Sequence, residues 1–339
     1  MPGGVALEHR LTLYHEASKR SGSSFAEEIR EGLSASPKRI AAWCLYDELG
    51  SVLFEAITLL PEYYLTRIET EILERHAEEI VALLEAPLEM IELGSGSGRK
   101  TRILIEAALR RQARLHYKPI DISPDALIAS ASSLLRAYDG LSVTAFAGDY
   151  RSALRSERLS LPRHALVLFL GSSIGNHEAR EAVSLLRAVR ESLSGGDALL
   201  LGADLRKSPS RIELAYDDPI GLTGCFNRNV LARINRELGG HFELDAFRYV
   251  VRYDERRACL DSFQESLREQ RVRIDALGME VAFAAGERIH TESSYKYDRA
   301  ELERIAHESG FALERSWTDE RGYYSLNLLL PAGPIHGPI

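Results

Sequence analysis

The chain has 339 residues, 45% of them hydrophobic, which is enough to bury one large core or two moderate ones. Its net charge of −8 disfavours a polyanionic partner, so nucleic acid is not an expected substrate. No apolar run approaches the roughly 20 residues that span a bilayer, and the start Met1-Pro2-Gly3-Gly4 lacks an export signal. We therefore expect a soluble, cytoplasmic protein without a membrane partner.

The three cysteines are too few and too far apart for a disulfide framework or a zinc cluster: Cys44, Cys225 and Cys259. We expect them to be packing residues, and we expect no metal cofactor. For the assembly we expect a monomer or a weak oligomer, although the sequence carries no direct signal for it. Along the chain, the segment from the N-terminus to about Tyr64 is predicted to be helical.

An apolar strand, Leu88–Leu93, leads directly into a glycine-rich loop and then into a helix at Thr101–Arg111. The loop has glycines at alternate positions after an acidic residue: Glu92, Gly94, Gly96 and Gly98. Glycines permit positive φ and close approach of a ligand, and the free amides at the helix start can face that ligand. A dinucleotide fold spaces its glycines as G-x-G-x-x-G instead, so the pattern favours S-adenosylmethionine (SAM) over NAD. A glycine-rich turn without a ligand is the alternative.

Acidic residues follow the next two strands. Asp121 lies at the end of the expected strand Leu115–Ile122, where a parallel sheet brings a carboxylate to ribose hydroxyls; NAD would need the same contact. After the third strand, Leu141–Ala147, the Asp149 carboxylate could hold the adenine amino group while Tyr150 stacks on the base. This third element favours SAM. The alternative for Asp149 is a helix cap.

Five expected strands alternate with helices, as a parallel βαβ sheet requires. The strands are Leu88–Leu93, Leu115–Ile122, Leu141–Ala147, Ala165–Leu170 and Ala198–Ala203, and helices are predicted at Thr101–Arg111, Pro124–Arg136 and Glu178–Leu193. After a further helix at Arg299–Ser309, the segments Phe311–Thr318 and Tyr323–Leu330 are predicted to form an antiparallel hairpin at the sheet edge. The fold class is therefore α/β, with a doubly wound, Rossmann-like sheet.

Two segments fall outside this core: the N-terminal segment and an insertion after the fifth strand, from Arg206 to about Ser294. The insertion carries a predicted helix at Gly221–Leu238 and a predicted strand at Arg271–Ala276. We expect residues 65–205 with 295–339 to form a cofactor-binding core, and residues 1–64 with 206–294 to form a substrate-binding domain. This domain is expected to cover the carboxyl ends of the strands, where such sheets bind ligands.

Six motifs, in order and in spacing, resemble the histidine-specific Nα-methyltransferases of ergothioneine biosynthesis. They are Leu60–Arg67, Glu92–Lys100, Phe169–Asn176, Ala215–Asp218, Phe226–Leu231 and Thr291–Tyr297. The resemblance covers almost the whole chain and implies a class I SAM-dependent methyltransferase core with a separate substrate domain. It also implies SAM as the methyl donor and conversion of L-histidine to Nα,Nα,Nα-trimethylhistidine, or hercynine.

The same resemblance implies a set of site residues. On the substrate side these are Tyr63 beside the ring, Asn176 and Tyr216 at the carboxylate, Glu292 and Ser294 at the imidazole, and Tyr46 near the amine. The backbone carbonyl of Gly171 could also hold the amine. On the cofactor side the matching positions are Gly94, Lys100, Asp121, Asp149 and Tyr150, and we expect the other loop glycines, Gly96 and Gly98, to bind the cofactor as well.

The chain departs from the family pattern at Leu45, Leu65 and Cys259. Leu45 replaces an aromatic residue and Leu65 replaces a proline. Cys259 occupies the position at which the family usually places a methionine that faces the ring, so we include it among the substrate-binding residues. Of the three departures, Cys259 most affects the expected fit of the substrate. In addition, Tyr150 takes a position that is often phenylalanine in the family.

Glu292 and Ser294 are two positions apart, so an extended segment places both side chains on one face. Thr291 and Ser293 would then point to the other face. A carboxylate accepts hydrogen bonds and a hydroxyl both donates and accepts, so the pair can satisfy both nitrogens of an imidazole. An exposed polar strand edge is the alternative interpretation of this segment.

Two other predicted substrate residues also have a purely structural interpretation. Asn176 follows a strand and a glycine and could act as the N-cap of the helix predicted at Glu178–Leu193. The pair Tyr63-Tyr64 could be core packing, because tyrosine buries well when its hydroxyl is satisfied. From these residues alone both interpretations stay open.

The expected mechanism is alignment of a neutral amine with the methyl carbon of SAM, because the sulfonium is already an activated leaving group. Desolvation beside that cation disfavours the ammonium form, so no dedicated base is expected. The alternatives are an enzyme of the same fold acting on another amine, such as an indole amino acid, a nucleotide-binding regulator without turnover, and a dehydrogenase. The pair Glu292 and Ser294 favours histidine, because an indole offers one N–H and no acceptor nitrogen.

Overall fold

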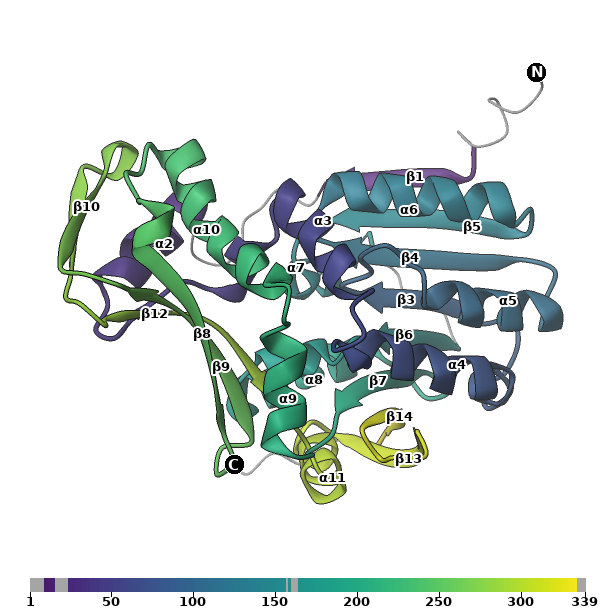
Figure 1. Cartoon of the computed structure of the whole chain (residues 1–339). Coiled ribbons are helices and arrows are strands. Elements are labelled where there is room, and N and C mark those ends of the chain that lie inside the picture. The colour runs from purple at the N-terminus through teal and green to yellow at the C-terminus, as the bar shows by residue number, and fades with distance from the viewer. Residues whose placement is uncertain (1–8, 16–23, 157, 160–163, 334–339) are drawn as a thin grey trace, which may run out of the picture. The chain divides into compact units, whose positions relative to one another are not determined.

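The computed structural model of the chain describes residues 9–15, 24–156, 158–159 and 164–333. It divides into two compact units, each built from segments that are distant in the sequence (Figure 1). The first unit comprises Met1–Lys19, Leu65–Arg206 and Lys296–Ile339, and the second comprises Arg20–Tyr64 and Lys207–Tyr295. Each unit contains its own β-sheet.

The first unit is built on an eight-stranded sheet in the order β1-β5-β4-β3-β6-β7-β14-β13. Its strands are β1 (Leu11–His15), β3 (Glu89–Leu93), β4 (Leu115–Asp121), β5 (Leu141–Ala147), β6 (Ala165–Phe169), β7 (Ala198–Asp204), β13 (Phe311–Thr318) and β14 (Tyr324–Pro331). The strands from β1 to β7 in this order are parallel, whereas β14 is antiparallel to both β7 and β13. This arrangement confirms the predicted Rossmann-like sheet and the hairpin at its edge.

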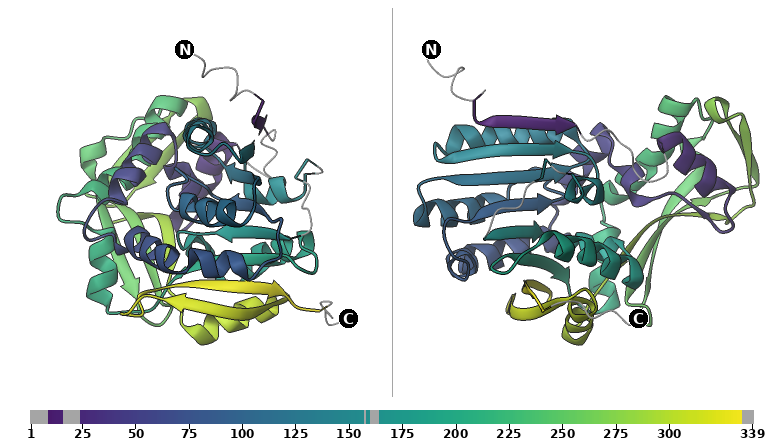
Figure 2. Two further views of the ribbon diagram at one scale, coloured as in Figure 1. Left: turned by 90° about the vertical axis from the view of Figure 1, so that its right-hand side faces the viewer. Right: turned by 180° about the vertical axis from the view of Figure 1, so that it is seen from behind.

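Helices cover both faces of this sheet. They are α4 (Tyr64–Ala82), α5 (Thr101–Arg111), α6 (Pro124–Ala137), α7 (Tyr150–Leu154), α8 (Ala179–Ser192) and α11 (Arg299–Glu308), with a 3-10 turn η2 (Ser173–Asn176). Helices α4, α5 and α6 lie on one face, and α8 and α11 lie on the other (Figure 1, Figure 2). Local sequence sets the helix starts: Ser123 caps α6, and Asp298 forms a capping box with Glu301 in α11. The central strands β6 and β7 are buried along their whole length, as expected between two helical layers.

The N-terminal segment differs from its prediction. We predicted residues 1–64 to be helical and to belong to the substrate domain. Helices α2 (Phe25–Ser34) and α3 (Glu48–Ile57) confirm the helical prediction for part of this segment, but β1 pairs in parallel with β5 at the edge of the core sheet, from Leu11↔Val143 to His15↔Ala147. Thr12 is exposed between the less exposed Leu11 and Leu13, which is strand-like over these three residues. Residues 1–8 and 16–23 lie outside the described residues. The remaining unit boundaries fall after Arg206 and Tyr295, where the prediction had residues 205 and 294.

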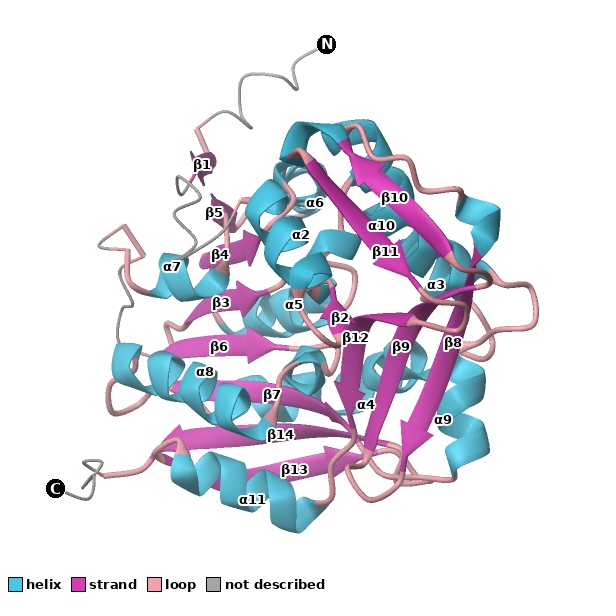
Figure 3. Ribbon diagram, turned by 90° about the vertical axis from the view of Figure 1, so that its left-hand side faces the viewer, coloured by secondary structure: helices cyan, strands magenta, loops and turns pink. Residues whose placement is uncertain are grey.

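The second unit contains a four-stranded sheet in the order β2-β12-β9-β8 and a separate hairpin of β10 and β11 (Figure 3). The strands are β2 (Lys38–Arg39), β8 (Phe247–Asp254), β9 (Cys259–Ser266), β10 (Gln270–Ile274), β11 (Met279–Phe283) and β12 (Arg288–Tyr295). The helices are α2 (Phe25–Ser34), α3 (Glu48–Ile57), α9 (Pro209–Tyr216) and α10 (Leu222–Leu238), with 3-10 turns η1 (Ala42–Leu45), η3 (Leu244–Ala246) and η4 (Asp275–Leu277). Helices α9 and α10 hydrogen-bond to one face of the sheet, through Tyr249 to Tyr216 and through Gln264 to Asn227.

Most of this second sheet was not predicted. Polar side chains occur on both faces of β9, whose sequence is C-L-D-S-F-Q-E-S, so the alternation of apolar and polar residues that usually reveals a strand is missing. The helix predicted at Gly221–Leu238 and the strand predicted at Arg271–Ala276 are confirmed as α10 and β10, with shifted ends. Among the described residues, none of the helices combines the length and the apolar character needed to cross a membrane.

Candidate functional site

The glycine loop of the first unit adopts the backbone that its sequence predicts. Gly94, Gly96 and Gly98 have φ angles of +73°, +50° and +66°, which side chains rarely tolerate. A Cβ on Gly98 would lie 2.5 Å from the hydroxyl of Ser130, so packing excludes a side chain there as well. A Cβ on Gly94 would meet nothing within 4 Å, so the space beside this glycine is open. The loop can therefore admit a ligand close to its backbone.

Polar groups in and after this loop fit a cofactor with charged and hydrogen-bonding ends. The Ser95 hydroxyl is buried and has no hydrogen-bond partner within the described part of the chain. Buried polar groups are normally paired, so this hydroxyl is suited to a ligand atom. The Lys100 side chain, 20% exposed, supplies a cation immediately before α5. These observations fit SAM, whose amino-acid end carries a carboxylate.

Glu92, the acidic residue of the motif, is hydrogen-bonded to the segments that flank the glycine loop. It is buried, accepts a hydrogen bond from the Thr101 hydroxyl at 2.6 Å and is also bonded by the Tyr117 hydroxyl. Burial raises the pKa of Glu92 to about 7. This carboxyl group therefore ties β3 to β4 and to the first residue of α5, and its role is to fix the position of the loop.

Asp121 lies at the end of β4 beside the glycine loop, as its position in the sequence predicts. One carboxylate oxygen accepts from the backbone N–H of Gly96 at 2.8 Å, and the other accepts from that of Ser123 at 3.0 Å. Burial raises the pKa of Asp121 above its ordinary value. The structure thus brings Asp121 and the loop together, while its contact with a ribose stays a prediction.

Asp149 and Tyr150 lie at the start of α7. Asp149 is the N-cap of this helix: its carboxylate accepts from the backbone N–H of Ser152 at 3.0 Å and from the Ser152 hydroxyl at 2.7 Å. The alternative interpretation of Asp149 as a cap is therefore confirmed, and its contact with adenine stays a prediction. Tyr150 packs its ring against Phe169, with centroids 5.8 Å apart, and its hydroxyl lies 2.8 Å from Nε2 of His177.

The turn after β6 contains Gly171 and Asn176. Gly171 and Ser172 both have left-handed backbones, with φ of +74° and +58°. Asn176 is exposed at the end of η2. The N-cap of α8 is Glu178, so the alternative interpretation of Asn176 as that cap is wrong. The Asn176 side chain therefore does not cap α8.

In the second unit, β12 is extended and its residues 292–295 pair with β9. Glu292 is opposite Ser262 and Ser294 is opposite Leu260, so both predicted imidazole ligands share one face, the face that carries α9 and α10. The Ser294 hydroxyl lies 2.8 Å from the Tyr216 hydroxyl on α9. Three predicted substrate residues therefore meet within this unit.

The prediction for the opposite face of β12 is only half right. Ser293 points away from Glu292 and donates to Asp261 at 2.6 Å. Thr291, in contrast, donates to Asn227 of α10 at 2.9 Å. The cause is a register shift between His290 and Glu292, because a bulge breaks the simple alternation of strand side chains.

Aromatic rings surround the predicted substrate residues of the second unit. Tyr63 is 7% exposed and lies edge-on to both Phe54 and Tyr216, with centroids 6.1 Å apart in each case. The ring centroid of Tyr46 lies 5.5 Å from that of Phe54 and 5.3 Å from that of Phe226. The alternative interpretation of Tyr63 as a packing residue thus fits the structure, and its contact with the substrate ring stays a prediction.

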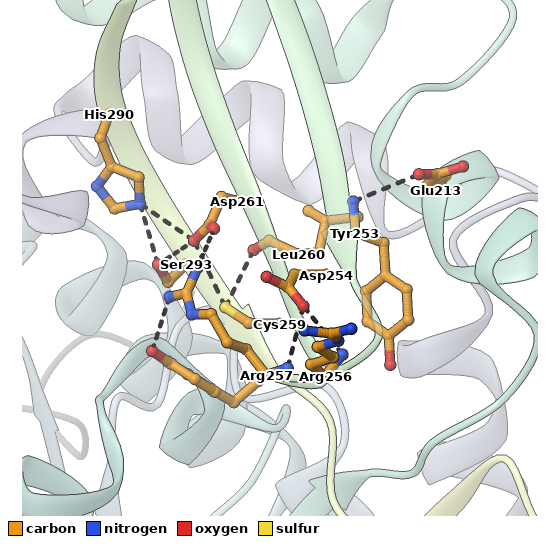
Figure 4. A network of polar contacts seen from close by, with 11 residues as sticks. Glu213, Tyr253, Asp254, Arg256, Arg257, Cys259, Leu260, Asp261, His290 and Ser293 are labelled. Atoms are coloured by element: carbon orange, nitrogen blue, oxygen red, sulfur yellow. Dashed lines mark hydrogen bonds and ion pairs between the residues drawn. The ribbon is translucent and has the colours of Figure 1, made fainter.

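Cys259 requires a correction. It is opposite Tyr295 on β12, so its side chain lies on the sheet face away from Glu292 and Ser294. Its thiol lies 3.5 Å from the Asp261 carboxylate, in a network that also includes Arg257, Ser293 and His290 (Figure 4). Burial raises the pKa of Cys259 to about 12, which keeps the thiol neutral. The prediction that Cys259 faces the ring beside Glu292 is therefore wrong.

The other two departures from the family pattern are core residues. Leu45 is fully buried in η1, and Leu65 is 2% exposed in the first turn of α4. A leucine at either position contributes apolar packing, and neither is a polar group that could recognise a substrate.

Sequence reasoning missed three residues that accompany the predicted site: Ser262, Tyr249 and Glu69. Ser262 shares the face of Glu292, and its hydroxyl lies 3.1 Å from that of Tyr249, which donates to the backbone carbonyl of Tyr216 at 3.0 Å. Burial raises the pKa of Tyr249, so it stays a hydrogen-bond donor. The signal for Ser262 was its register with Glu292, which requires both strands to be recognised. Glu69 lies on α4 four residues after Leu65 and three before Ile72, so the helical period of these apolar residues was the signal that its position is buried.

Comparisons with known proteins agree with the motifs. A family model described as "Histidine-specific methyltransferase, SAM-dependent" matches residues 25–331. The histidine N-alpha-methyltransferases of Mycolicibacterium smegmatis and Mycobacterium tuberculosis are 37% and 39% identical, covering 92% and 89% of this chain and 96% and 93% of theirs. Ergothioneine biosynthesis protein 1 of Neurospora crassa is 31% identical over 86% of this chain and 33% of its own length.

Proposed function

Because the chain belongs to the family of histidine-specific, SAM-dependent methyltransferases, we propose that it methylates the α-amino group of free L-histidine to hercynine for ergothioneine biosynthesis. The single observation that carries the choice of substrate is the shared face of Glu292 and Ser294 on β12. A carboxylate that accepts and a hydroxyl that can donate, placed on one face, match the need of an imidazole for one acceptor and one donor.

In this proposal Glu292 accepts the imidazole N–H, and the Ser294 hydroxyl donates to the second ring nitrogen. The hydrogen bond between Ser294 and Tyr216 supports this division, because Tyr216 can accept or donate as the Ser294 proton turns toward the ring. Ser262 lies opposite Glu292 on the same face, and Tyr249 connects the Ser262 hydroxyl to the backbone carbonyl of Tyr216. Asn176 is proposed to donate its amide to the substrate carboxylate, together with the Tyr216 hydroxyl.

The amine is the reacting group, and the protein's task is to orient it. Tyr46 and the carbonyl of Gly171 are proposed to accept hydrogen bonds from the N–H groups of the primary and monomethylated amine, whereas the neutral dimethylated amine has no N–H left in the third transfer. The aromatic rings of Tyr46, Tyr63 and Phe226 provide faces that stabilise the growing positive charge of the methylated amine. The third methylation leaves a quaternary nitrogen without a lone pair, so the reaction stops there chemically.

For the cofactor, we propose that Lys100 and the Ser95 hydroxyl bind the amino-acid end of SAM, while Asp121 binds the ribose. SAM supplies an electrophilic methyl group on a sulfonium. Asp149 and Tyr150 are proposed to bind the adenine; Asp149 keeps lone pairs for this contact while it caps α7. No metal takes part in this proposal.

Mass spectrometry after incubation with SAM and one amino acid at a time tests the proposal. We expect L-histidine to gain three methyl groups, and we expect tryptophan and phenylalanine to remain unmodified. Histamine, which lacks the carboxylate, should be methylated far more slowly, because two polar groups of the site would stay unpaired. Methylation of tryptophan in preference to histidine would overturn the assignment of the substrate.

A further inference from the structure

A buried carboxylate on α4 connects parts of the first unit that lie far apart in the sequence. Glu69 has no exposed surface. Its carboxylate accepts from the backbone N–H of Gly171, at 2.9 Å and 3.0 Å to the two oxygens, and from the Tyr324 hydroxyl at 2.6 Å, and it forms an ion pair with Lys100. A buried charge is tolerated only when it is paired and hydrogen-bonded, and these contacts meet that condition.

A glycine on β7 leaves room for this carboxylate. Strand β7 is buried throughout, yet it has a glycine at position 202. A Cβ on Gly202 would lie 2.4 Å from an oxygen of Glu69 and 2.4 Å from the hydroxyl of Tyr324. Both groups are buried, so a side chain at position 202 would clash with the carboxylate and with the hydroxyl bonded to it.

One contact of Glu69 fixes the turn after β6. Gly171 and Ser172 are left-handed there, which for Ser172 is an unfavourable conformation that its surroundings must maintain. The hydroxyl and the carbonyl of Ser172 accept from the backbone of Asp204 and Gly175, at 2.9 Å and 2.8 Å. Glu69 holds the Gly171 N–H, and no hydrogen bond within the described residues uses the Gly171 carbonyl oxygen. That carbonyl remains available to a donor such as the substrate amine.

The second contact of Glu69 fixes the cation next to the glycine loop. A Cβ on Gly171 would lie 3.4 Å from the Lys100 ammonium, so this ammonium and the Gly171 backbone are neighbours. A lysine side chain has many rotamers and loses freedom when it is held in one of them. The Glu69 carboxylate selects the rotamer that brings the ammonium to this place.

We propose that Glu69 is a positioning residue of the methyl transfer, holding the Lys100 ammonium for the cofactor carboxylate and the Gly171 peptide for the substrate amine. The inference rests on the proposed roles of Lys100 and Gly171. Glu69 touches neither reactant itself. One buried carboxylate thereby sets the geometry of both the cofactor contact and the amine contact.

Two substitutions separate these effects. Glu69→Gln keeps an oxygen that accepts from Gly171 but loses the charge that holds Lys100. We expect its affinity for S-adenosylhomocysteine (SAH), measured by calorimetry, to fall at least about fivefold, with kcat at saturating substrates within about twofold of wild type. Glu69→Ala also releases Gly171, so we expect kcat to fall at least about tenfold. An unchanged kcat in Glu69→Ala, or an equal loss of kcat in both variants, would overturn the proposal.

A double-mutant cycle tests the route through Lys100 and does not depend on the alanine variant folding. In a Lys100→Met background, Glu69→Gln should cause no further loss of SAH affinity, because Glu69 acts on the cofactor through that ammonium. An additional, independent loss would overturn this route. The control is Glu79→Gln on the same helix, which removes the charge that pairs with Arg315 but keeps an oxygen that can accept from Trp317, and it should change neither kcat nor SAH affinity. A wild-type chain that fails to methylate histidine would refute the proposed function, whereas the SAH cycle would still report on Glu69.

Discussion

At the scale of single residues, recognition of an imidazole depends on Glu292. If its carboxylate accepts the ring N–H, alanine at this position leaves a ring nitrogen unsatisfied, and we expect kcat/KM for histidine to fall by about 2 to 4 kcal/mol. Ser293→Ala is the matched control, because the neighbouring hydroxyl lies on the other face of β12 and bonds to Asp261. Steady-state kinetics with histidine measure both variants. Wild-type histidine kinetics in Glu292→Ala, with SAH binding intact, would remove Glu292 from the site.

Also at the residue scale, Glu92 makes stability depend on pH. Its pKa in the folded protein is raised from the ordinary 4.5 to about 7. The contribution of Glu92 to the free energy of unfolding is therefore fully present below the ordinary pKa and is lost as the pH rises through the folded pKa of about 7. Between pH 5 and pH 8 the wild type should lose about 2 kcal/mol from this group alone. Glu92→Gln does not titrate.

Urea unfolding at several pH values tests this expectation. The stability of Glu92→Gln relative to wild type should therefore increase as the pH rises from 5 to 8. The single change removes the titrating group and keeps an amide oxygen that can accept from the Thr101 hydroxyl. A difference in stability that does not change with pH would show that Glu92 does not titrate in this range.

At the scale of elements, the two faces of β9 separate substrate recognition from structural support. Ser262 and Cys259 lie on one strand but on opposite faces, and only Ser262 is opposite Glu292. We expect Ser262→Val to lower kcat/KM for histidine at least about tenfold, because it removes the hydroxyl bonded to Tyr249 and adds a methyl group toward the ring. Cys259→Val should change kcat/KM less than about twofold. A larger effect at Cys259 than at Ser262 would contradict the assignment of the faces.

The elements that could be predicted from sequence are those with a clear hydrophobic period. Strands β3, β4, β5, β6 and β7 and helices α5, α6 and α8 were predicted with ends within one or two residues, because each is apolar on the faces that the sheet buries. Strand β9 was not predicted, and β12 was anticipated only as an extended segment around Glu292, because both strands carry the polar residues of the site and of the network around Asp261. Without β9 as a strand, no register was available to show that Cys259 and Ser262 point in opposite directions.

At the scale of the whole molecule, the order of the motifs identified the family and most of the candidate site residues. The contacts between segments that are distant in the sequence could be seen only in the structure. The ion pair of Glu69 and Lys100 joins α4 to the glycine loop, and the bond of Glu69 to Gly171 joins α4 to the turn after β6. The apolar residues at helical spacing around Glu69 indicate a buried position, but they do not indicate which distant groups its carboxylate meets. Likewise, β1 joins the core sheet although more than one hundred residues separate it from its partner β5.

The assignment of the cofactor to the first unit and of the imidazole ring to β12 of the second is testable by hydrogen exchange. At a concentration of 100 Kd a ligand stabilises the folded state that binds it by about 2.7 kcal/mol, which slows exchange by global unfolding at all residues. Additional local slowing of deuterium uptake marks the residues that the ligand contacts. We expect SAH to slow deuterium uptake most in residues 94–100 and at the carboxyl end of β4, where Asp121 bonds to Gly96. With SAH present, L-histidine should add protection to β12 around Glu292 and to the end of α9 at Tyr216, and phenylalanine at the same concentration is the control. Protection of β12 by SAH alone, with an unchanged glycine loop, would show that the cofactor is assigned to the wrong unit.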